Sequence, residues 1–383
     1  MQAEIKPLSG IKVLDLTSYI AGPYCTLLLS AFGAEIVKVE SPLGDESRTW
    51  PPIKDGFSGY FANFHGGKKS FSLDLKQPEN REILNKLISK CDVFIHNYTG
   101  KTRRKLDMGY ETIAKLNPNV IYCNISGFGA SGPYEDRKGF DTIFQAMSGV
   151  TWLTGEKGGS PIKAGVPVGD VSGGLFSALS VMAAIHKRSL TGKGEYIDMS
   201  MVDGLVNFLP VALSFYSFTG KSPARLGSQH PGRVPSATFL CADEKYVHIS
   251  VTDGQWGRLC DILGLPEWRE DEFYKLNNNR VKAREEVMAK ISAAIGKIER
   301  ADLVKQCMEQ GIPCGEVFSI DEIENDPQIQ FRNTIDKVQL DNGLTVRYAN
   351  YPAKFKEMDV SLNRDVPKVG QHNEEVLKNW LGE

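Results

Sequence analysis

Patterns that mark metal sites, disulfide frameworks and two common enzyme classes are missing from this chain of 383 residues. The seven cysteines form no Cys-x-x-Cys pair and the six histidines show no His-x-x-x-His spacing, so no metal site is predicted. An odd number of scattered cysteines indicates free thiols and a cytoplasmic location. The chain also has no Gly-x-x-x-x-Gly-Lys-Ser/Thr run and no Gly-x-Ser-x-Gly elbow, which disfavours a nucleoside triphosphatase and a common esterase.

Neither sign of charge dominates the composition. The formal net charge is −2, and the charged (24%) and hydrophobic (41%) fractions are those of a globular protein. We therefore expect no nucleic acid and no anionic membrane as a partner. The first residues are polar and no run of 18 apolar residues is present, so neither a signal peptide nor a membrane span is expected.

The first 200 residues alternate between strand-like and helix-like segments. The strand-like segments are 11–16, 35–39, 92–96, 120–126 and 196–199. The helix-like segments are 21–32, 79–89, 110–116, 171–187 and 202–218. This alternation predicts a doubly wound, Rossmann-like α/β domain with a parallel sheet. Its first strand-to-helix turn, residues 17–23, lacks the Gly-x-Gly-x-x-Gly pattern that binds a dinucleotide, which disfavours a nicotinamide or flavin enzyme.

A change in composition predicts a second, smaller α+β domain. The large α/β domain would take residues 1–218 as its first part, followed by a linker over 219–235 that is rich in Gly, Pro, Ser and Arg. The small domain would then cover 236–325, and 326–383 would return to the large domain. The segments that predict these parts are a hairpin over 237–251, helices over 256–263, 280–295 and 300–310, a strand over 316–320, and a hairpin over 338–348 around Asp341-Asn342-Gly343.

Asp170 follows a Pro-Val-Gly turn and precedes a long run of helix-forming residues. Aspartate is a preferred N-cap residue, so a helix cap is the plainer interpretation of this position. A helix N-terminus also favours negative charge, which would keep the carboxylate ionised and nucleophilic. The small residues around Asp170 would let a bulky ligand approach. The two roles are therefore compatible.

Seven separate runs carry a further signal when they are taken together: 8–16, 21–23, 33–42, 68–75, 126–134, 169–170 and 192–200. Together they resemble the class III CoA-transferase family, which includes formyl-CoA transferases, carnitine CoA-transferases and 2-methylacyl-CoA racemases. They are colinear with the family over nearly the whole chain. The resemblance implies an interlocked homodimer, coenzyme A thioesters as substrates, and no metal or redox cofactor.

The resemblance also implies a covalent mechanism on Asp170. CoA would move from an acyl-CoA, such as succinyl-CoA, to a free carboxylic acid through an aspartyl anhydride and an aspartyl-CoA thioester. The racemases carry Gly-His-Asp where this chain has Gly139-Phe140-Asp141, and phenylalanine cannot move a proton. This difference favours transfer over the racemase alternative, while the intact Gly169-Asp170 pair disfavours an idle CoA-binding subunit. Asp141 would either raise the pKa of Asp170 or be structural.

The remaining site residues are predicted from the resemblance alone. CoA binding would fall to Lys38, Lys69, Asn97, Tyr98, Arg104 and Lys138. The substrate pocket would include Ile20, Phe140, Asp141, Gly254 and Gln255. Ile20 stands where formyl-CoA transferases carry a glutamine, which disfavours formyl-CoA or oxalate as substrate. Gly254 and Gln255 belong to a stretch, 251–256, that matches a loop covering the site in relatives.

Overall fold

The computed structural model describes residues 5–340 and 343–383, which form two compact units. Unit 1 comprises the described parts of 1–151, 163–220 and 327–383, and unit 2 comprises 152–162 and 221–326. The segment 152–162, which the sequence places in the large domain, belongs to unit 2. The reason is that Gly227 N donates to Gly155 O at 3.1 Å and the Arg225 guanidinium donates to the carbonyls of Gly159 and Trp152.

Unit 1 contains a sheet of six parallel strands in the order β5-β2-β1-β6-β7-β8. The strands are β1 (Lys12–Leu16), β2 (Glu35–Glu40), β5 (Lys69–Ser72), β6 (Val93–His96), β7 (Ile121–Ser126) and β8 (Glu195–Ser200). Counted in chain order this is 3-2-1-4-5-6, the strand order of the Rossmann fold. The predicted α/β class with a large parallel sheet is confirmed. The strand order reverses between β1 and β6, where such sheets bind ligands.

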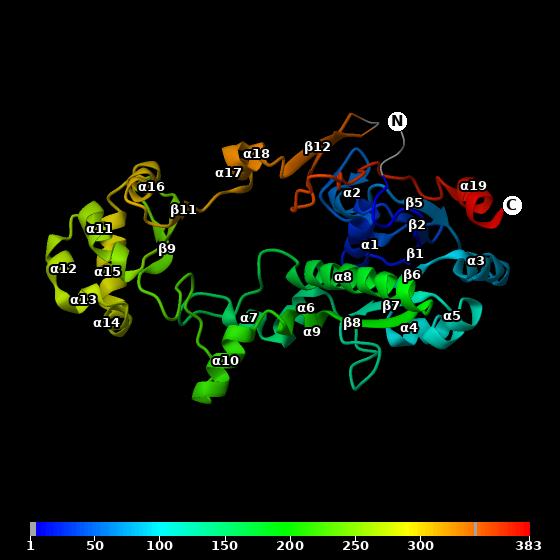
Figure 1. The fold of residues 1–383 in the computed structure, drawn as a ribbon, viewed down its shortest axis with the longest axis horizontal. Helices are drawn as coiled ribbons and strands as arrows, with labels where there is room; N and C mark the ends of the chain where they lie inside the picture. The colour runs from blue at the N-terminus through cyan, green and yellow to red at the C-terminus, as the bar shows by residue number, and fades with distance from the viewer. Residues whose placement is uncertain (1–4, 341–342) are drawn as a thin grey trace. The chain divides into compact units, whose positions relative to one another are not determined.

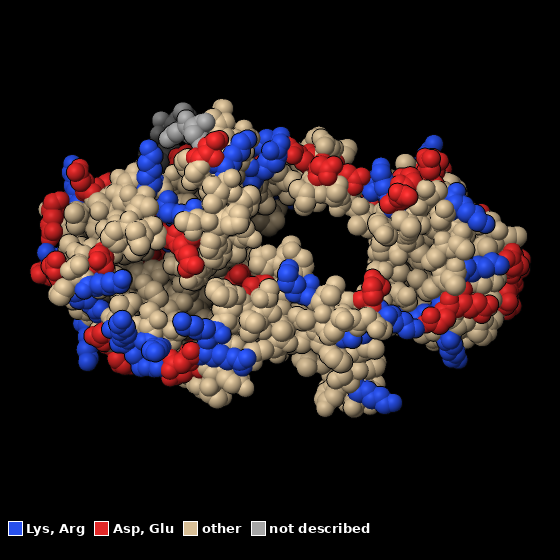
Figure 2. Space-filling view, turned by 180° about the vertical axis from the view of Figure 1, so that it is seen from behind, with Lys and Arg blue, Asp and Glu red and all other residues tan. Residues whose placement is uncertain are grey.

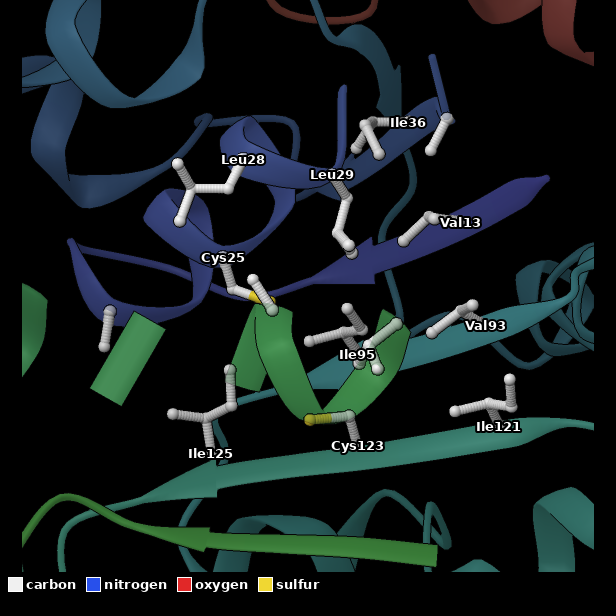
Figure 3. Packing of buried hydrophobic residues seen from close by; sticks show 14 of the residues in the cluster. Val13, Cys25, Leu28, Leu29, Ile36, Val93, Ile95, Ile121, Cys123 and Ile125 are labelled. Atoms are coloured by element: carbon white, nitrogen blue, oxygen red, sulfur yellow. The ribbon is translucent and has the colours of Figure 1, made fainter. Parts of the chain in front are cut away.

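Helices cover both faces of this sheet (Figure 1). The main ones are α1 (Ala21–Ala31) and α8 (Val168–Thr191) on one face, and α3 (Pro78–Lys90) and α5 (Tyr110–Leu116) on the other. Side chains of a strand alternate between faces, so Val13 joins the α1/α8 cluster and Leu14 the α3/α5 cluster. Figure 3 shows Val13, Leu29, Ile95 and Cys123 among the side chains of the first cluster.

Helix α8 begins three residues earlier than predicted and packs closely on α1. A Cβ atom on Gly174 would lie 2.6 Å from the carbonyl oxygen of Ala21, so only glycine permits this approach. Gly174 therefore serves the packing of α8 on α1. By length and apolar composition alone α8 could span a membrane, and one side of it packs against α1, β7 and β8.

Two predicted helices are each divided in the structure. The segment 202–218 forms α9 (Met201–Val206) and α10 (Pro210–Thr219), because Pro210 lacks an amide hydrogen and is suited to the first position of a new helix. The segment 280–295 forms α14 (Asn277–Lys282) and α15 (Arg284–Ile295). The short strand predicted at 316–320 lies earlier, as β11 (Cys314–Glu316).

Shorter elements complete unit 1. They are η1 (Glu46–Thr49), β3 (Ile53–Lys54), β4 (Phe57–Ser58), α2 (Gly59–His65), α4 (Gly100–Lys105), α6 (Asp141–Ser148), α18 (Pro327–Phe331), β12 (Ile335–Gln339), β13 (Thr345–Ala349), α19 (Asn373–Val376) and η2 (Leu377–Leu381). Strands β12 and β13 pair antiparallel, which confirms the returning hairpin. Two residues of its predicted turn, Asp341 and Asn342, lie outside the described residues. Helix α7 (Val150–Leu153) spans the boundary between the units.

Unit 2 is built on a small antiparallel sheet in the order β11-β10-β9, in which β9 (Ser236–Leu240) and β10 (Tyr246–Ser250) form the predicted hairpin. Its other helices are α11 (Asp253–Leu263), α12 (Pro266–Glu270), α13 (Glu272–Lys275), α16 (Arg300–Glu309) and α17 (Ile320–Asn325). Figure 2 shows acidic and basic side chains interspersed over the face that it presents, as the small net charge suggests.

Candidate active site

A pocket of about 450 Å³ opens in unit 1 at the carboxyl ends of the central strands. Ser18 and Tyr19 follow β1, and Asn97 and Tyr98 follow β6, so the pocket lies where the strand order reverses. Asp170, from the first turn of α8, also lines it. Parallel α/β sheets place their ligands at this position, because the loops diverge there and leave a crevice. The fold therefore places Asp170, the predicted nucleophile, in the pocket where a ligand is expected to bind.

The Asp170 carboxylate is partly buried and lacks hydrogen-bond donors. None of the residues 5–340 and 343–383 donates a hydrogen bond to its oxygens. Burial, followed by the nearby charge of Asp141, raises the pKa of Asp170 to about 7. A carboxylate with so high a pKa is more basic than an ordinary aspartate, and a pKa shifted in this way inside a pocket is characteristic of functional sites. Asp170 is thus suited to attack an electrophilic carbonyl carbon.

The start of α8 is capped by Asp141 and not by Asp170. The N-cap position is Pro167, and Asp170 is the third residue of the helix. Asp141, the first residue of α6, accepts hydrogen bonds at Oδ1 from the backbone amides of Gly169 (2.7 Å) and Asp170 (3.3 Å). The cap predicted for Asp170 is therefore wrong. The same contacts explain why the helix N-terminus does not keep Asp170 ionised, since its amides already serve another carboxylate.

Three aromatic side chains form an apolar wall of the pocket. The Tyr19 ring stacks on Trp50 with centroids 5.4 Å apart and meets the edge of Phe140 at 6.1 Å. Tyr19 has a φ of +72°, which is uncommon for a residue with a side chain, and its hydroxyl donates to Glu46 at 3.0 Å. Burial and Glu46 raise the pKa of Tyr19 to about 12, so the phenol is protonated near neutral pH. Sequence reasoning missed Tyr19 and Trp50, because no local pattern announces a positive φ or a stacked pair.

Lys38 is enclosed beneath the first loop of the pocket. Its ammonium is 2.8 Å from Asp45 Oδ2, donates to the carbonyl of Thr17 at 2.7 Å, and is almost fully buried. Burial opposes its charge, but Asp45 and other carboxylates raise the pKa of Lys38 above its usual range. The resemblance implied that Lys38 binds CoA. In the structure its ammonium is instead held by Asp45 and Thr17, and Lys38 does not line the pocket. It fixes Thr17, directly before Ser18 and Tyr19.

Three other predicted binding residues do not line the pocket. Lys69 forms ion pairs with Glu35 (2.6 Å) and Glu375 (2.8 Å). The exposed Arg104 pairs with Glu135 and Asp136 beside the pocket. Ile20 is buried at the N-cap position of α1. Ion pairs hold Lys69 and Arg104 away from the pocket, and burial encloses Ile20.

The cations that do line the pocket are Lys138 and Arg137. The Arg137 guanidinium lies over the rings of Phe128 (5.5 Å) and Tyr134 (5.2 Å), which limits its freedom. Sequence reasoning named Lys138 but not Arg137, although the two are adjacent.

Gly254 and Gln255 lie at the start of α11 in unit 2. Gln255 forms a capping box with Thr252, and its Nε2 donates to the carbonyl of Gly311 at 2.9 Å. Both residues belong to unit 2, and their role over the Asp170 pocket stays a prediction.

All seven cysteines are free, and the described residues contain no group of three His, Cys, Asp or Glu arranged to hold a metal ion.

A Gly-x-Gly-x-x-Gly run does occur after β7, at residues 127–132. In the dinucleotide motif such a run opens a helix, whereas here the next helix, α6, begins only at Asp141. Backbone amides of the loop bind side chains instead: Gly129 N donates to Ser126 Oγ and Ala130 N to Asp198. The loop is therefore a wall of the pocket and not a pyrophosphate site.

Comparison with known proteins identifies the class. Residues 8–373 match CoA-transferase family III. Succinate–glutarate CoA-transferase of Agrobacterium fabrum is 36% identical over 379 residues, covering 97% of this chain and 95% of that protein. Succinyl-CoA:mesaconate CoA-transferase of Haloarcula hispanica is 36% identical over 382 residues, again covering 97% and 95%. The crystal structure of a CAIB/BAIF family protein from Brucella suis superposes with a TM-score of 0.89 at 34% identity, covering 98% of this chain and 100% of that one.

The chain therefore belongs to CoA-transferase family III. More specifically, it is an acyl-CoA:carboxylate CoA-transferase. The predicted family and enzyme class are confirmed.

Proposed function

We propose that this protein moves CoA from succinyl-CoA to a free dicarboxylic acid, with Asp170 as the covalent nucleophile. The observation that carries the proposal is Asp170 itself: a partly buried carboxylate in the pocket, with a pKa raised to about 7 and no hydrogen bond from the described residues to its oxygens. The substrate classes rest on the relatives, whose names pair succinate or succinyl-CoA with glutarate or mesaconate.

The proposed cycle has four acyl transfers and needs no net proton transfer. An oxygen of ionised Asp170 attacks the thioester carbon of succinyl-CoA, and the carbon–sulfur bond breaks to give a mixed anhydride and CoA thiolate. The thiolate attacks the aspartyl carbonyl and releases succinate, leaving an aspartyl-CoA thioester. The acceptor carboxylate attacks that thioester, which releases the thiolate and gives a second anhydride. The thiolate then takes the acceptor acyl group and frees Asp170.

The electrostatics of the site favour the first step. In the free enzyme, burial and the charge of Asp141 both disfavour ionised Asp170. The anhydride and the thioester are neutral at this residue, so acylation removes the unfavourable charge. Bulk water must be kept from the anhydride, and the aromatic wall of Tyr19, Trp50 and Phe140 contributes to that exclusion.

We assign CoA recognition to the cations and polar groups of the same pocket. Lys138 and Arg137 would bind phosphate, and Asn97 and Tyr98 would contact the ligand after β6. Asn97 is already positioned, since its side chain accepts from Ser18 N and donates to Ser18 O. Phe140 lines the pocket where a racemase would carry a histidine, which supports transfer over racemisation.

We also propose a cytoplasmic homodimer, interlocked as in the family. Helices α8 and α10 of unit 1 expose large apolar side chains, with Leu179 63%, Val211 75% and Phe218 92% accessible. Exposed apolar area of this kind marks interaction surfaces. Light scattering should give twice the chain mass of 42.4 kDa, and a monomer that transfers CoA at full rate would reject the dimer.

The experiment that tests the function combines product analysis with trapping. The protein is incubated with succinyl-CoA and separate carboxylates, including glutarate, mesaconate and oxalate, and new thioesters are followed by mass spectrometry. We expect a glutaryl or mesaconyl thioester and, on adding hydroxylamine, a hydroxamate at Asp170. Transfer by Asp170→Ala at the wild-type rate would reject the nucleophile, and deuterium incorporation at the α-carbon without transfer would indicate a racemase.

A further inference from the structure

A second pocket of unit 1 combines an apolar lining with a buried cation. It has a volume of about 420 Å³ and shares no lining residue with the Asp170 pocket. Its apolar wall comes from α1, α2 and the returning segment, and includes Tyr24, Leu28, Tyr60, Phe64 and Tyr351. Pockets of this size and character bind small organic ligands. Arg364 also lines this pocket, which we call the Arg364 pocket.

The guanidinium of Arg364 is only partly satisfied. Its Nη1 donates to the carbonyl of Asn63 at 2.9 Å and its Nη2 to the carbonyl of Ala349 at 2.7 Å. The Nε–H is buried and has no acceptor among the described residues. The group lies 4.1 Å from the ring centre of Tyr348, and the residue is 5% exposed. An unsatisfied donor this deep in a native structure calls for a ligand or a water molecule.

Arg364 also lacks an anionic partner. It forms no ion pair with a carboxylate in the described part of the chain. Burial lowers the pKa of Arg364 to about 10, and Asp336 acts on it from beyond ion-pair distance. The side chain is therefore still charged near neutral pH. A buried charge without a counter-ion is unfavourable, and an anion entering the pocket would compensate it.

We propose that the Arg364 pocket binds a small organic carboxylate with an aromatic or aliphatic body. The carboxylate would lie against the Arg364 guanidinium where this residue lines the pocket, and would pair with it through charge and hydrogen bonds. The body would lie against Tyr24, Tyr60 and Phe64, where the pocket is apolar. This site is separate from CoA transfer and does not depend on the mechanism at Asp170.

The proposal can be tested by calorimetry on the full chain without CoA, with 4-phenylbutanoate as the probe and 4-phenylbutanamide as its neutral match. We expect saturable binding of the carboxylate and affinity for the amide that is weaker by about tenfold or more, because the charge-assisted hydrogen bonds are lost. Equal affinity for the two compounds, or no binding of either, would overturn the proposal.

Two variants locate the binding. Ala349 is exposed and lines the pocket, so Ala349→Trp should fill it and abolish binding while CoA transfer continues at the wild-type rate. Arg364→Gln should weaken binding about tenfold, with circular dichroism as the check on folding. If Arg364→Gln does not fold, Ala349→Trp decides. If Ala349→Trp binds the probe as the wild type does, the probe binds elsewhere and the proposal fails. The proposal also fails if the wild type binds no probe and Ala349→Trp changes the oligomeric state, because a second copy of the chain then fills the pocket.

Discussion

The carboxylate of Asp141 accepts a hydrogen bond from the backbone amide of Asp170 at 3.3 Å, across 29 residues of sequence. It also accepts one from Gly169 and one from the side chain of Gln145. One aspartate therefore holds the backbone of the other while its charge raises the pKa of the other carboxyl. Asp141 therefore holds the start of α8 and the backbone of Asp170, and after burial it is the second cause of the raised pKa of Asp170.

Replacing Asp141 should change the pH dependence of catalysis. Wild-type kcat/KM should fall as the pH drops through about 7, because protonated Asp170 cannot attack. In Asp141→Asn the fall should occur at lower pH, by at most about one unit, since burial, the larger cause of the shift, remains. Asp203→Asn, at the start of α9, is the matched control and should leave the profile unchanged. Superimposable profiles for wild type and Asp141→Asn would contradict the coupling.

Replacing Asp170 by asparagine should stabilise the protein while abolishing activity. A carboxyl whose pKa is raised on folding costs stability as the pH rises from its unfolded value of 3.8 through about 7. The gain from Asp170→Asn should therefore be absent near pH 4 and reach about 1–3 kcal/mol at pH 8, reduced by partial exposure. Denaturant melts at both pH values measure it. If Asp170→Asn is less stable than the wild type at pH 8, ionised Asp170 does not destabilise the folded protein.

Lys138 and Lys69, two of the three lysines predicted to bind CoA, should behave differently. Lys138 lines the pocket, so Lys138→Ala should raise KM for succinyl-CoA by about tenfold with little change in kcat. Lys69 is occupied by Glu35 and Glu375 away from the pocket, so Lys69→Ala should change KM less than about twofold. Steady-state kinetics with varied succinyl-CoA decides. A larger rise in KM for Lys69→Ala than for Lys138→Ala would indicate that Lys69 contacts the phosphates of CoA.

Lys38 should matter for stability and not as a ligand contact. Lys38→Met leaves the carboxylate of Asp45 buried without its cation, which should cost about 3–5 kcal/mol of unfolding free energy. Lys69→Met breaks partly exposed ion pairs and should cost no more than about 1 kcal/mol. Urea unfolding of both variants makes the comparison. If the two variants lose similar amounts of unfolding free energy, the Lys38–Asp45 pair does not stabilise the fold more than an exposed ion pair does.

Much of the fold was predictable because its signals are local. Alternating strand and helix segments gave the parallel sheet, and five of its six strands were located from short apolar runs. The four-residue β5 was missed as a strand, since Lys69–Ser72 alternates too briefly to show a period. Pro210 was read as part of a helix although its missing amide hydrogen starts a new one.

The sequence by itself determined the parallel α/β class, the place of Asp170 near the start of a long helix, and the colinear motifs of the family. Those features depend on neighbouring residues, whose propensities and spacing are visible along the chain. Only the tertiary structure decided that Asp141 caps α8, that Lys38 is buried against Asp45, and that Tyr19 stacks on Trp50 beside the pocket. Each of these depends on segments that meet only after folding, because burial and the distance between charges set a pKa or a partner, and neither can be read from sequence order.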